Sequence, residues 1–282
     1  MKKRIIFSGL LVFFIFIGCK KNSIDNPDNL KAKDLTGIKY GDHVSQSLDV
    51  YLPANRDEQT KMIIFIHGGF WIGGDKAELT DLAKTYRDKG YVSASVNYRL
   101  SHTAENNIHP AQVNDLDKAI QFIESQADDW ETSTSNVALV GASAGGHIAL
   151  LYTYAYDTGN KVKTVISLAG PTNLTDMQSA SPQQAQVVQW FLGASAQTSP
   201  AIYQQASPIS HVNATSKPTL LFHGKLDVIV PYQQSVSLKT KLDQFNVKNK
   251  LVTYDNLGHE ADLNAIPGFV SELDSWLSVY LK

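Results

Sequence analysis

Residues 137–151 read VALVGASAGGHIALL, and this stretch predicts how the chain folds at its centre. An apolar run suited to a strand leads into Gly-x-Ser-x-Gly around Ser143, and an apolar segment with helical character follows. Gly141 and Gly145 carry no side chains, so the backbone can turn tightly and present the Ser143 hydroxyl. The pattern predicts a nucleophilic serine. The alternative is a chance Gly-x-Ser-x-Gly in a glycine-bearing loop.

Strand and helix patterns alternate on both sides of this turn. The run MIIFIH at 62–67 is continuously apolar, which is typical of a strand buried on both faces. Expected strands lie at 43–53, 62–67, 91–100, 135–141, 163–170, 217–224 and 250–256, and expected helices at 78–90, 110–130, 146–156, 233–245 and 267–281. This alternation predicts an α/β fold with a mostly parallel central sheet and helices on both faces. The segment 171–216 breaks the alternation, and we expect an inserted helical flap there.

Size and charge narrow the function classes. The chain has 282 residues and a formal net charge of −2. Near-neutral charge argues against a nucleic-acid partner, because phosphate binding needs a basic surface.

Residues 20–34 are polar and contain a proline, so we expect a flexible tether. No second linker of this kind follows, and we therefore expect one domain from 35 to 282. The oligomeric state is left open.

The N-terminus has the pattern of an export signal. A cationic MKKR precedes an apolar run of 14 residues, which is shorter than the roughly 20 residues that span a bilayer. The run ends in FIGC, which resembles the lipobox of bacterial lipoproteins, with Phe16 in place of the usual Leu. We expect residues 1–19 to be a lipoprotein signal, Cys19 to be lipidated, and the protein to be exported and anchored to a bacterial membrane. The alternatives are an ordinary signal peptide cleaved elsewhere and an uncleaved anchor.

A nucleophilic serine needs a base and an acid that orients the base. Of the eight histidines, only His259 follows both Ser143 and a late strand, so it is the expected base. Asp227 lies in the loop after the expected strand 217–224 and is the expected acid. A solvated turn histidine and a loop-capping aspartate are the alternatives. Asp255 and Asp262 flank His259 but are poorly placed to orient it.

The stretch FIHGGFWIGGDK at 65–76 follows the buried strand 62–67 and contains four glycines. Acyl transfer produces an oxyanion that backbone N–H groups must hold. By analogy with HGGG-type loops, the expected donors are the N–H groups of Gly69, Phe70 and Ala144. His67 is expected to hold this loop, and Asp75 to cap the next helix. The alternative is a glycine-rich turn that binds nothing.

No cluster of His, Cys and carboxylate residues has the spacing of metal ligands. The sequence therefore predicts a reaction that needs neither a metal nor another cofactor.

With these residues in view, the chain resembles the α/β-hydrolase superfamily, and within it the carboxylesterase and acetylesterase group related to hormone-sensitive lipase. It is similar to bacterial acetyl-xylan and feruloyl esterases and to arylformamidases. The resemblance is carried by HGGFWIGGDK, VNYRLS, HPAQVNDLDKAIQFI, GASAGGHIALL, FLG, ASPISHV, FHGKLDVIVPYQQS and GHE. Two departures caution against a lipase preference: Phe70 replaces a third glycine, and Ala142 stands where many lipase-like relatives carry an acidic residue.

The resemblance implies a serine hydrolase that cleaves carboxylic esters. Trp71, beside the expected oxyanion loop, is a candidate substrate contact, although aromatic residues there could equally be core. An exported location favours acetyl or feruloyl esters of plant polysaccharide over a cytoplasmic formamide. The alternatives are a general carboxylesterase or arylformamidase on small substrates, a peptidase or amidase, and a glycan-binding lipoprotein without activity.

Overall fold

The structure is a computed structural model that describes residues 30–101, 105, 107–133, 135–259 and 266–282. The expected signal segment 1–19, with Cys19, lies outside the described residues, and so does most of the expected tether. Asp262, one of the two aspartates that flank His259, also lies outside them.

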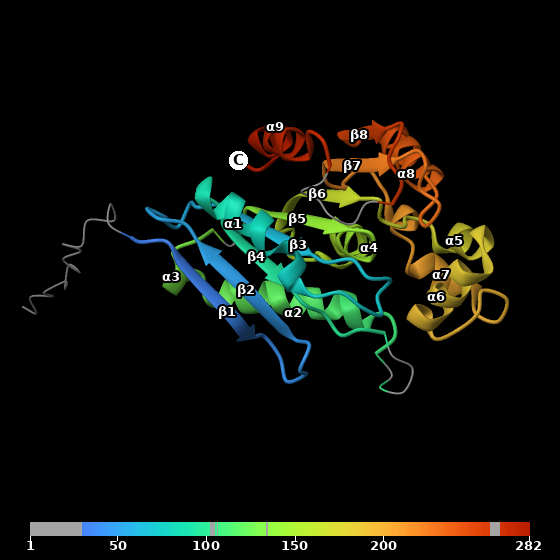
Figure 1. The fold of residues 1–282 in the computed structure, drawn as a ribbon, viewed down its shortest axis with the longest axis horizontal. Coiled ribbons are helices and arrows are strands. Elements are labelled where there is room, and N and C mark those ends of the chain that lie inside the picture. The colour runs from blue at the N-terminus through green and yellow to red at the C-terminus, as the bar shows by residue number, and fades with distance from the viewer. Residues whose placement is uncertain (1–29, 102–104, 106, 134, 260–265) are drawn as a thin grey trace, which may run out of the picture.

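Within the described residues, eight strands form one sheet in the order β1-β2-β4-β3-β5-β6-β7-β8. The strands are β1 (Lys33–Lys39), β2 (Ser47–Leu52), β3 (Met62–Ile66), β4 (Val92–Val96), β5 (Val137–Ala142), β6 (Val162–Leu168), β7 (Thr219–Gly224) and β8 (Asn249–Tyr254). The pairs β1·β2 and β2·β4 are antiparallel, and all later neighbours are parallel. Figure 1 shows the sheet running from the blue edge at β1 to the red edge at β8. The predicted mostly parallel sheet is confirmed.

The central strands are buried on both faces, as their continuous apolar runs predict. In β3, Met62, Ile64 and Ile66 belong to one core cluster, whereas Ile63 and Phe65 belong to the other. Successive side chains of a strand point to opposite faces, so this alternation divides one apolar strand between two cores.

Helices cover both faces of the sheet. They are η2 (Lys76–Leu79), α1 (Thr80–Asp88), α2 (Ala111–Ser125), α3 (Ala127–Trp130), α4 (Ala144–Leu151), η4 (Tyr152–Tyr156), α5 (Leu174–Ala180), α6 (Pro182–Leu192), α7 (Pro200–Gln205), η5 (Pro208–His211), α8 (Gln233–Gln244) and α9 (Phe269–Tyr280). Buried residues of α1 and α9 pack on one face, and those of α2, α4 and α8 on the other. The predicted two-faced covering is confirmed. No described helix combines the length and the apolar character needed to cross a bilayer.

The segment between β6 and β7 holds four helices, α5, α6, α7 and η5. Figure 1 shows α5, α6 and α7 grouped at one end of the molecule, toward which β5 and β6 point. In a parallel sheet, binding sites form outside the carboxyl ends of the strands. The flap therefore stands at the end of the sheet where the expected site residues follow their strands.

Several boundaries differ from expectation. β2 begins at Ser47 rather than at 43, and the expected helix 110–130 is divided into α2 and α3. β1 begins at Lys33, inside the segment 20–34 that was expected to be a tether. Its largely exposed residues carry little periodic signal, and only pairing with β2 makes it a strand. β4 ends at Val96 rather than at 100. Asn97 and Arg99 instead form polar contacts, with the backbone N–H of Lys76 and with Asp115.

Candidate active site

Ser143 occupies a strained turn between β5 and α4. Its φ of 51° and ψ of −118° lie in a region that residues other than glycine rarely adopt. A Cβ on Gly141 would come within 2.3 Å of the Gly145 carbonyl carbon and oxygen. A Cβ on Gly145 would come within 2.1 Å of the Ile66 carbonyl oxygen. Both glycines of the motif are therefore required by close backbone approach, as a nucleophile elbow demands.

The structure brings Ser143, His259 and Asp227 together in one chain of hydrogen bonds. His259 Nδ1 lies 2.7 Å from Asp227 Oδ2, and His259 Nε2 lies 3.0 Å from Ser143 Oγ. Donation from Nδ1 to the carboxylate leaves Nε2 free to accept the serine proton. This arrangement can therefore move a proton from the serine hydroxyl to the imidazole and hold the resulting positive charge.

The Asp227 carboxylate is held as an anion inside the protein. Its Oδ1 accepts hydrogen bonds from the N–H groups of Ile229 (2.9 Å) and Val230 (2.8 Å), and its side chain has no exposed area. Burial raises the pKa of Asp227, but hydrogen bonds from His223 and His259 outweigh burial and hold this pKa well below its usual range. Asp227 is thus ionised wherever the fold is intact near neutral pH.

The glycine-rich loop lies against the elbow. A Cβ on Gly68 would stand 3.4 Å from Ser143 Cβ, so this backbone runs directly beside the serine. Gly69 (φ 103°), Phe70 (φ 56°) and Trp71 all have positive φ. Within the described part of the chain, the N–H groups of Gly69 and Phe70 donate to no backbone or side-chain acceptor. Ala144 is the first residue of α4, so its N–H has no acceptor within the helix. Three donors are therefore available near Ser143, from the residues that the sequence predicted.

Supporting contacts hold this loop in place. His67 stacks on Tyr98 with ring centroids 4.4 Å apart, and its Nδ1 lies 2.8 Å from the Gly68 carbonyl oxygen. The Tyr98 hydroxyl donates to the same oxygen at 3.2 Å. Asp75 forms a capping box with Glu78 at the start of η2, which confirms its expected capping role.

A small apolar cavity opens beside Ser143. Its volume is about 20 Å³, and we call it the inner cavity. It is lined by Phe70, Trp71, Ser143, Ala144, Pro171, Met177, Gln184, Val187, Val188 and Val230. Nearly all of these side chains are apolar, so the inner cavity suits a short hydrocarbon group attached to a carbonyl bound at Ser143.

Trp71, the expected substrate contact, forms part of this cavity wall but is otherwise core. It is 2 % exposed and stacks on Phe191 with ring centroids 4.4 Å apart. Its Nε1 donates to His147 Nδ1 at 3.2 Å, and His147 Nε2 donates to the Ala206 carbonyl oxygen at 2.8 Å. Burial lowers the pKa of His147 to about 3, so the ring is neutral. These contacts tie the oxyanion loop, α4 and the flap together.

Two contacts of the acid loop were not predicted. His223, expected to be a packing or turn residue, has its Nε2 3.2 Å from Asp227 Oδ2 and 2.9 Å from the Val230 carbonyl oxygen. Gln184 Nε2, from the flap helix α6, donates to the Val228 carbonyl oxygen at 3.1 Å. The four-residue spacing of His223 and Asp227 was the available signal for the first contact. No local pattern points to the second, because it joins the flap to a distant loop.

Comparison with known proteins identifies the family of the chain. The BD-FAE family matches residues 48–242, which is more than half of the chain. Esterase LipC of Mycobacterium tuberculosis is 29 % identical over 252 residues, covering 80 % of this chain and 59 % of its own length. A probable isoprenylcysteine alpha-carbonyl methylesterase of Arabidopsis thaliana is 26 % identical, covering 79 % of this chain and 50 % of its own length. The chain thus spans little more than half of these relatives.

Solved structures share the fold. A truncated carbohydrate esterase from gut microbiota has a TM-score of 0.76 at 24 % identity, with 90 % of this chain and 99 % of that chain covered. A bifunctional GH43-CE protein of Bacteroides eggerthii has a TM-score of 0.75 at 23 % identity, with 87 % and 38 % covered. The family match, the sheet topology and these shared folds agree: the chain belongs to the BD-FAE family, within the α/β-hydrolase superfamily.

Proposed function

We propose that this protein is a serine hydrolase that cleaves carboxylic esters through an acyl-enzyme. The observation that carries the proposal is the continuous hydrogen-bonded chain from Ser143 through His259 to Asp227. The names of the relatives support it, since LipC is an esterase and the plant relative a probable methylesterase.

Each step uses a group already in position. Ser143 Oγ attacks the ester carbonyl carbon as His259 Nε2 takes its proton, and the N–H groups of Gly69, Phe70 and Ala144 hold the oxyanion. Collapse of this intermediate breaks the bond to the alcohol oxygen, which receives the proton from His259. A water molecule then attacks the acyl-enzyme with the same base, and the carboxylic acid leaves.

The substrates we propose are acetyl or feruloyl esters of plant polysaccharide. Two observations support a carbohydrate ester: the similar structures named above are described as a carbohydrate esterase and a GH43-CE protein, and the N-terminal sequence has the pattern of an export signal. The inner cavity favours the acetyl group, because about 20 Å³ beside Ser143 is small for a feruloyl ring.

Released acid measures this function directly. The domain from Lys20 onward would be incubated with acetylated xylan, with methyl ferulate and with p-nitrophenyl acetate, and compared with its Ser143→Ala variant. We expect acid from the wild type, and a loss of turnover on the order of 10⁴ or more in the variant. Substantial activity in the pure variant would overturn the assignment of Ser143.

A general carboxylesterase acting on small esters is the second candidate, and the two curated relatives named above favour it, because one is named an esterase and the other a probable methylesterase. Cleavage of p-nitrophenyl acetate without any release of acetate from xylan or of ferulate would support this alternative. Labelling of Ser143 by a fluorophosphonate probe separates both enzymes from a glycan-binding protein that has lost activity.

We also propose that the protein is exported and anchored to a bacterial membrane through a lipid on Cys19. The proposal rests on the cationic start, the apolar run and FIGC. In a bacterial host, the full chain should appear in the membrane fraction and its Cys19→Ser variant in the soluble fraction. Membrane retention of the variant would contradict the lipid anchor.

A further inference from the structure

A second and much larger cavity lies next to the inner one. Its volume is about 650 Å³, and we call it the outer cavity. No residue lines both cavities, but the same two elements contribute to both. In the loop after β3, Phe70 and Trp71 line the inner cavity and Ile72 the outer one, and in α6 Val188 lines the inner cavity and Trp190 the outer one. The outer cavity is lined by His43, Val44, Ser45, Ile72, Leu100, Ser101, Glu105, Asn107 and Trp190.

Exposed apolar side chains gather at the outer cavity. Val44 (77 %), Ile72 (40 %) and Trp190 (43 %) are among the most exposed large hydrophobic residues of the described chain, and all three line it. A cluster of exposed apolar groups is unfavourable in water unless it binds something. Trp190 in particular adds an exposed aromatic side chain to the lining of the outer cavity.

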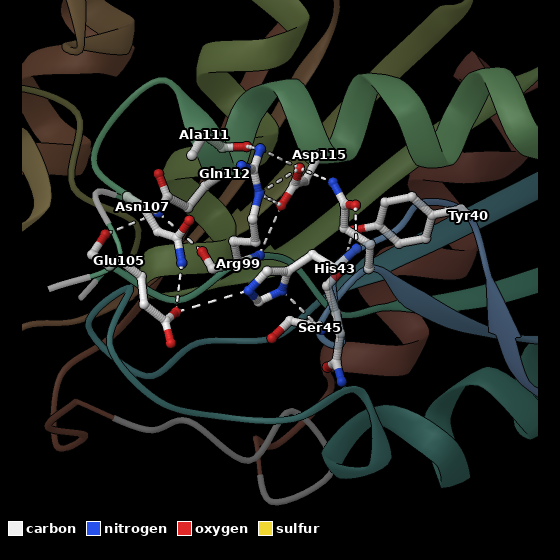
Figure 2. A network of polar contacts seen from close by, with 12 residues as sticks. Tyr40, His43, Ser45, Arg99, Glu105, Asn107, Ala111, Gln112 and Asp115 are labelled. Atoms are coloured by element: carbon white, nitrogen blue, oxygen red, sulfur yellow. Dashed lines mark hydrogen bonds and ion pairs between the residues drawn. The ribbon is translucent and has the colours of Figure 1, made fainter. Parts of the chain in front are cut away.

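Polar groups face these apolar ones. Glu105 Oε2 accepts a hydrogen bond from Asn107 Nδ2 at 3.0 Å and lies 3.8 Å from His43 Nε2 (Figure 2). Within the part of the chain that the structure describes, Glu105 Oε1 and the Ser45 hydroxyl have no partner. The outer cavity therefore presents both a carboxylate acceptor and a hydroxyl to a ligand.

Helix α2 holds both polar rims of the outer cavity in place. Gln112, which is fully buried, donates from Nε2 to Ser101 Oγ (2.9 Å) and to the Asn107 carbonyl oxygen (2.6 Å). Asp115 accepts from Gln46 Nε2 at 2.7 Å, and Gln46 Oε1 accepts from the His43 N–H at 3.1 Å. Figure 2 shows Gln112 and Asp115 beside the helix at the top of the view, with His43, Ser45 and Glu105 below them. The site is therefore built before any ligand arrives, which reduces the ordering cost of binding.

The charge of the outer cavity limits the chemical classes of ligand that can bind there. No Lys or Arg is among its described lining residues, and Glu105 is the only carboxylate there. An anionic group would be repelled. An apolar acyl chain would leave the carboxylate, amide and hydroxyl groups without partners. A neutral ring with many hydroxyl groups and an apolar C–H face matches both kinds of wall.

From these observations we infer that the outer cavity binds a neutral sugar unit of the substrate, on the alcohol side of the ester, with Trp190 as its stacking surface. The inference rests on the proposed esterase function. It assigns the two sides of the ester to two cavities: the acyl group to the inner one and the sugar to the outer one.

Binding without turnover tests the site independently of catalysis. Unsubstituted xylotetraose would be titrated into the Ser143→Ala protein by isothermal calorimetry, and then into Ser143→Ala/Trp190→Ala. We expect millimolar binding by the first protein and at least a tenfold weaker affinity in the second, equivalent to about 1.4 kcal/mol. No binding by the first protein, or equal binding by both, would overturn the inference.

Kinetics with the active enzyme give the second test. Trp190→Ala should lower kcat/KM for acetylated xylotetraose about tenfold through KM, and leave ethyl acetate, whose alcohol carries no ring to stack on Trp190, within about twofold. Trp190→Phe should recover part of the loss. Phe245→Ala is the matched control, because Phe245 is similarly exposed at 36 % but lies at the end of α8 and lines neither cavity.

The outcomes separate the two proposals. A wild type that fails to cleave p-nitrophenyl acetate contradicts the esterase function itself. An active wild type whose Trp190→Ala variant loses both substrates equally, or neither, contradicts only the sugar site. A selective loss on methyl ferulate would place the aromatic acyl group in the outer cavity and also overturn the inference.

Discussion

The inner and outer cavities are both lined by the loop after β3 and by α6, but they differ in size and chemistry. The inner cavity, about 20 Å³, is apolar and ends at Ser143, whereas the outer one, about 650 Å³, is lined by exposed apolar and polar groups. If the proposed sugar site holds, this difference separates two kinds of selection: the acyl group by size, and the alcohol by hydrogen bonding and stacking. Changes on the inner side should therefore affect every ester, and changes on the outer side only those with a sugar.

The largest effect should come from the acid of the inner site. Asp227→Asn replaces an acceptor with an amide whose N–H₂ would face the Nδ1–H of His259, and so disfavours the productive tautomer. We expect kcat to fall by a factor on the order of 10³ to 10⁴. The fall should be equal for p-nitrophenyl acetate and acetylated xylotetraose, as measured by steady-state kinetics.

Asp255→Asn is the matched control for this prediction. Asp255 also neighbours His259 in sequence, but it is exposed and pairs with Lys225 at 2.8 Å. Its variant should keep wild-type kcat. If Asp255→Asn were the inactive variant, or if Asp227→Asn spared one of the two esters, the acid would be misassigned.

The next effect concerns the neutral His147, which contacts Trp71 of the inner cavity lining. Its folded pKa of about 3 lies below the ordinary value of about 6.5. The neutral ring therefore contributes stability that is present above pH 6.5 and is lost as the pH falls toward 3. Between pH 8 and pH 5 this loss is about 2 kcal/mol in the free energy of unfolding.

Urea denaturation at both pH values checks the size of this loss. His147→Asn should be less stable at pH 8, because it loses packing against Trp71 and Phe191. It should nevertheless lose about 2 kcal/mol less than the wild type on going to pH 5. Identical losses in the two proteins would show that the His147 ring does not stay neutral in the fold.

The smallest effect should come from the size of the inner cavity. The wild type should prefer p-nitrophenyl acetate to the butyrate, because extra methylene groups overfill about 20 Å³. Val187→Ala removes methyl groups from the lining and should raise the butyrate-to-acetate ratio of kcat/KM about fivefold. Val236→Ala, in α8 and outside both cavities, should leave the ratio unchanged. If the butyrate-to-acetate ratio rose equally in both variants, the inner cavity would not be what selects the acyl group by size.

Much of the candidate site could be predicted because its central part is local. The elbow needs two glycines within five residues, and the reason is the same close backbone approach that the structure shows at Gly141 and Gly145. His259 and Asp227 could be predicted from their order in the chain, because each follows a late strand. The structure joins Asp227 to His259 across 32 residues and His259 to Ser143 across 116 residues.

Other features could not be predicted, because they depend on contacts between distant segments. The edge strand β1 exists through pairing with β2 and has no apolar pattern of its own. The burial of Trp71 depends on Phe191 and His147, and the support of the acid loop depends on Gln184 from the flap.

The sequence by itself determined the α/β order of elements, the elbow at Ser143 and the glycine-rich loop beside it, because short-range steric rules govern tight turns and strand periodicity. Only the tertiary structure decided what surrounds the serine. Both cavities are assembled from segments far apart in the chain, such as His43, Ile72, Asn107 and Trp190 around the outer one. Their size and polarity follow from how loops and the flap pack over the sheet, and no local pattern encodes that packing.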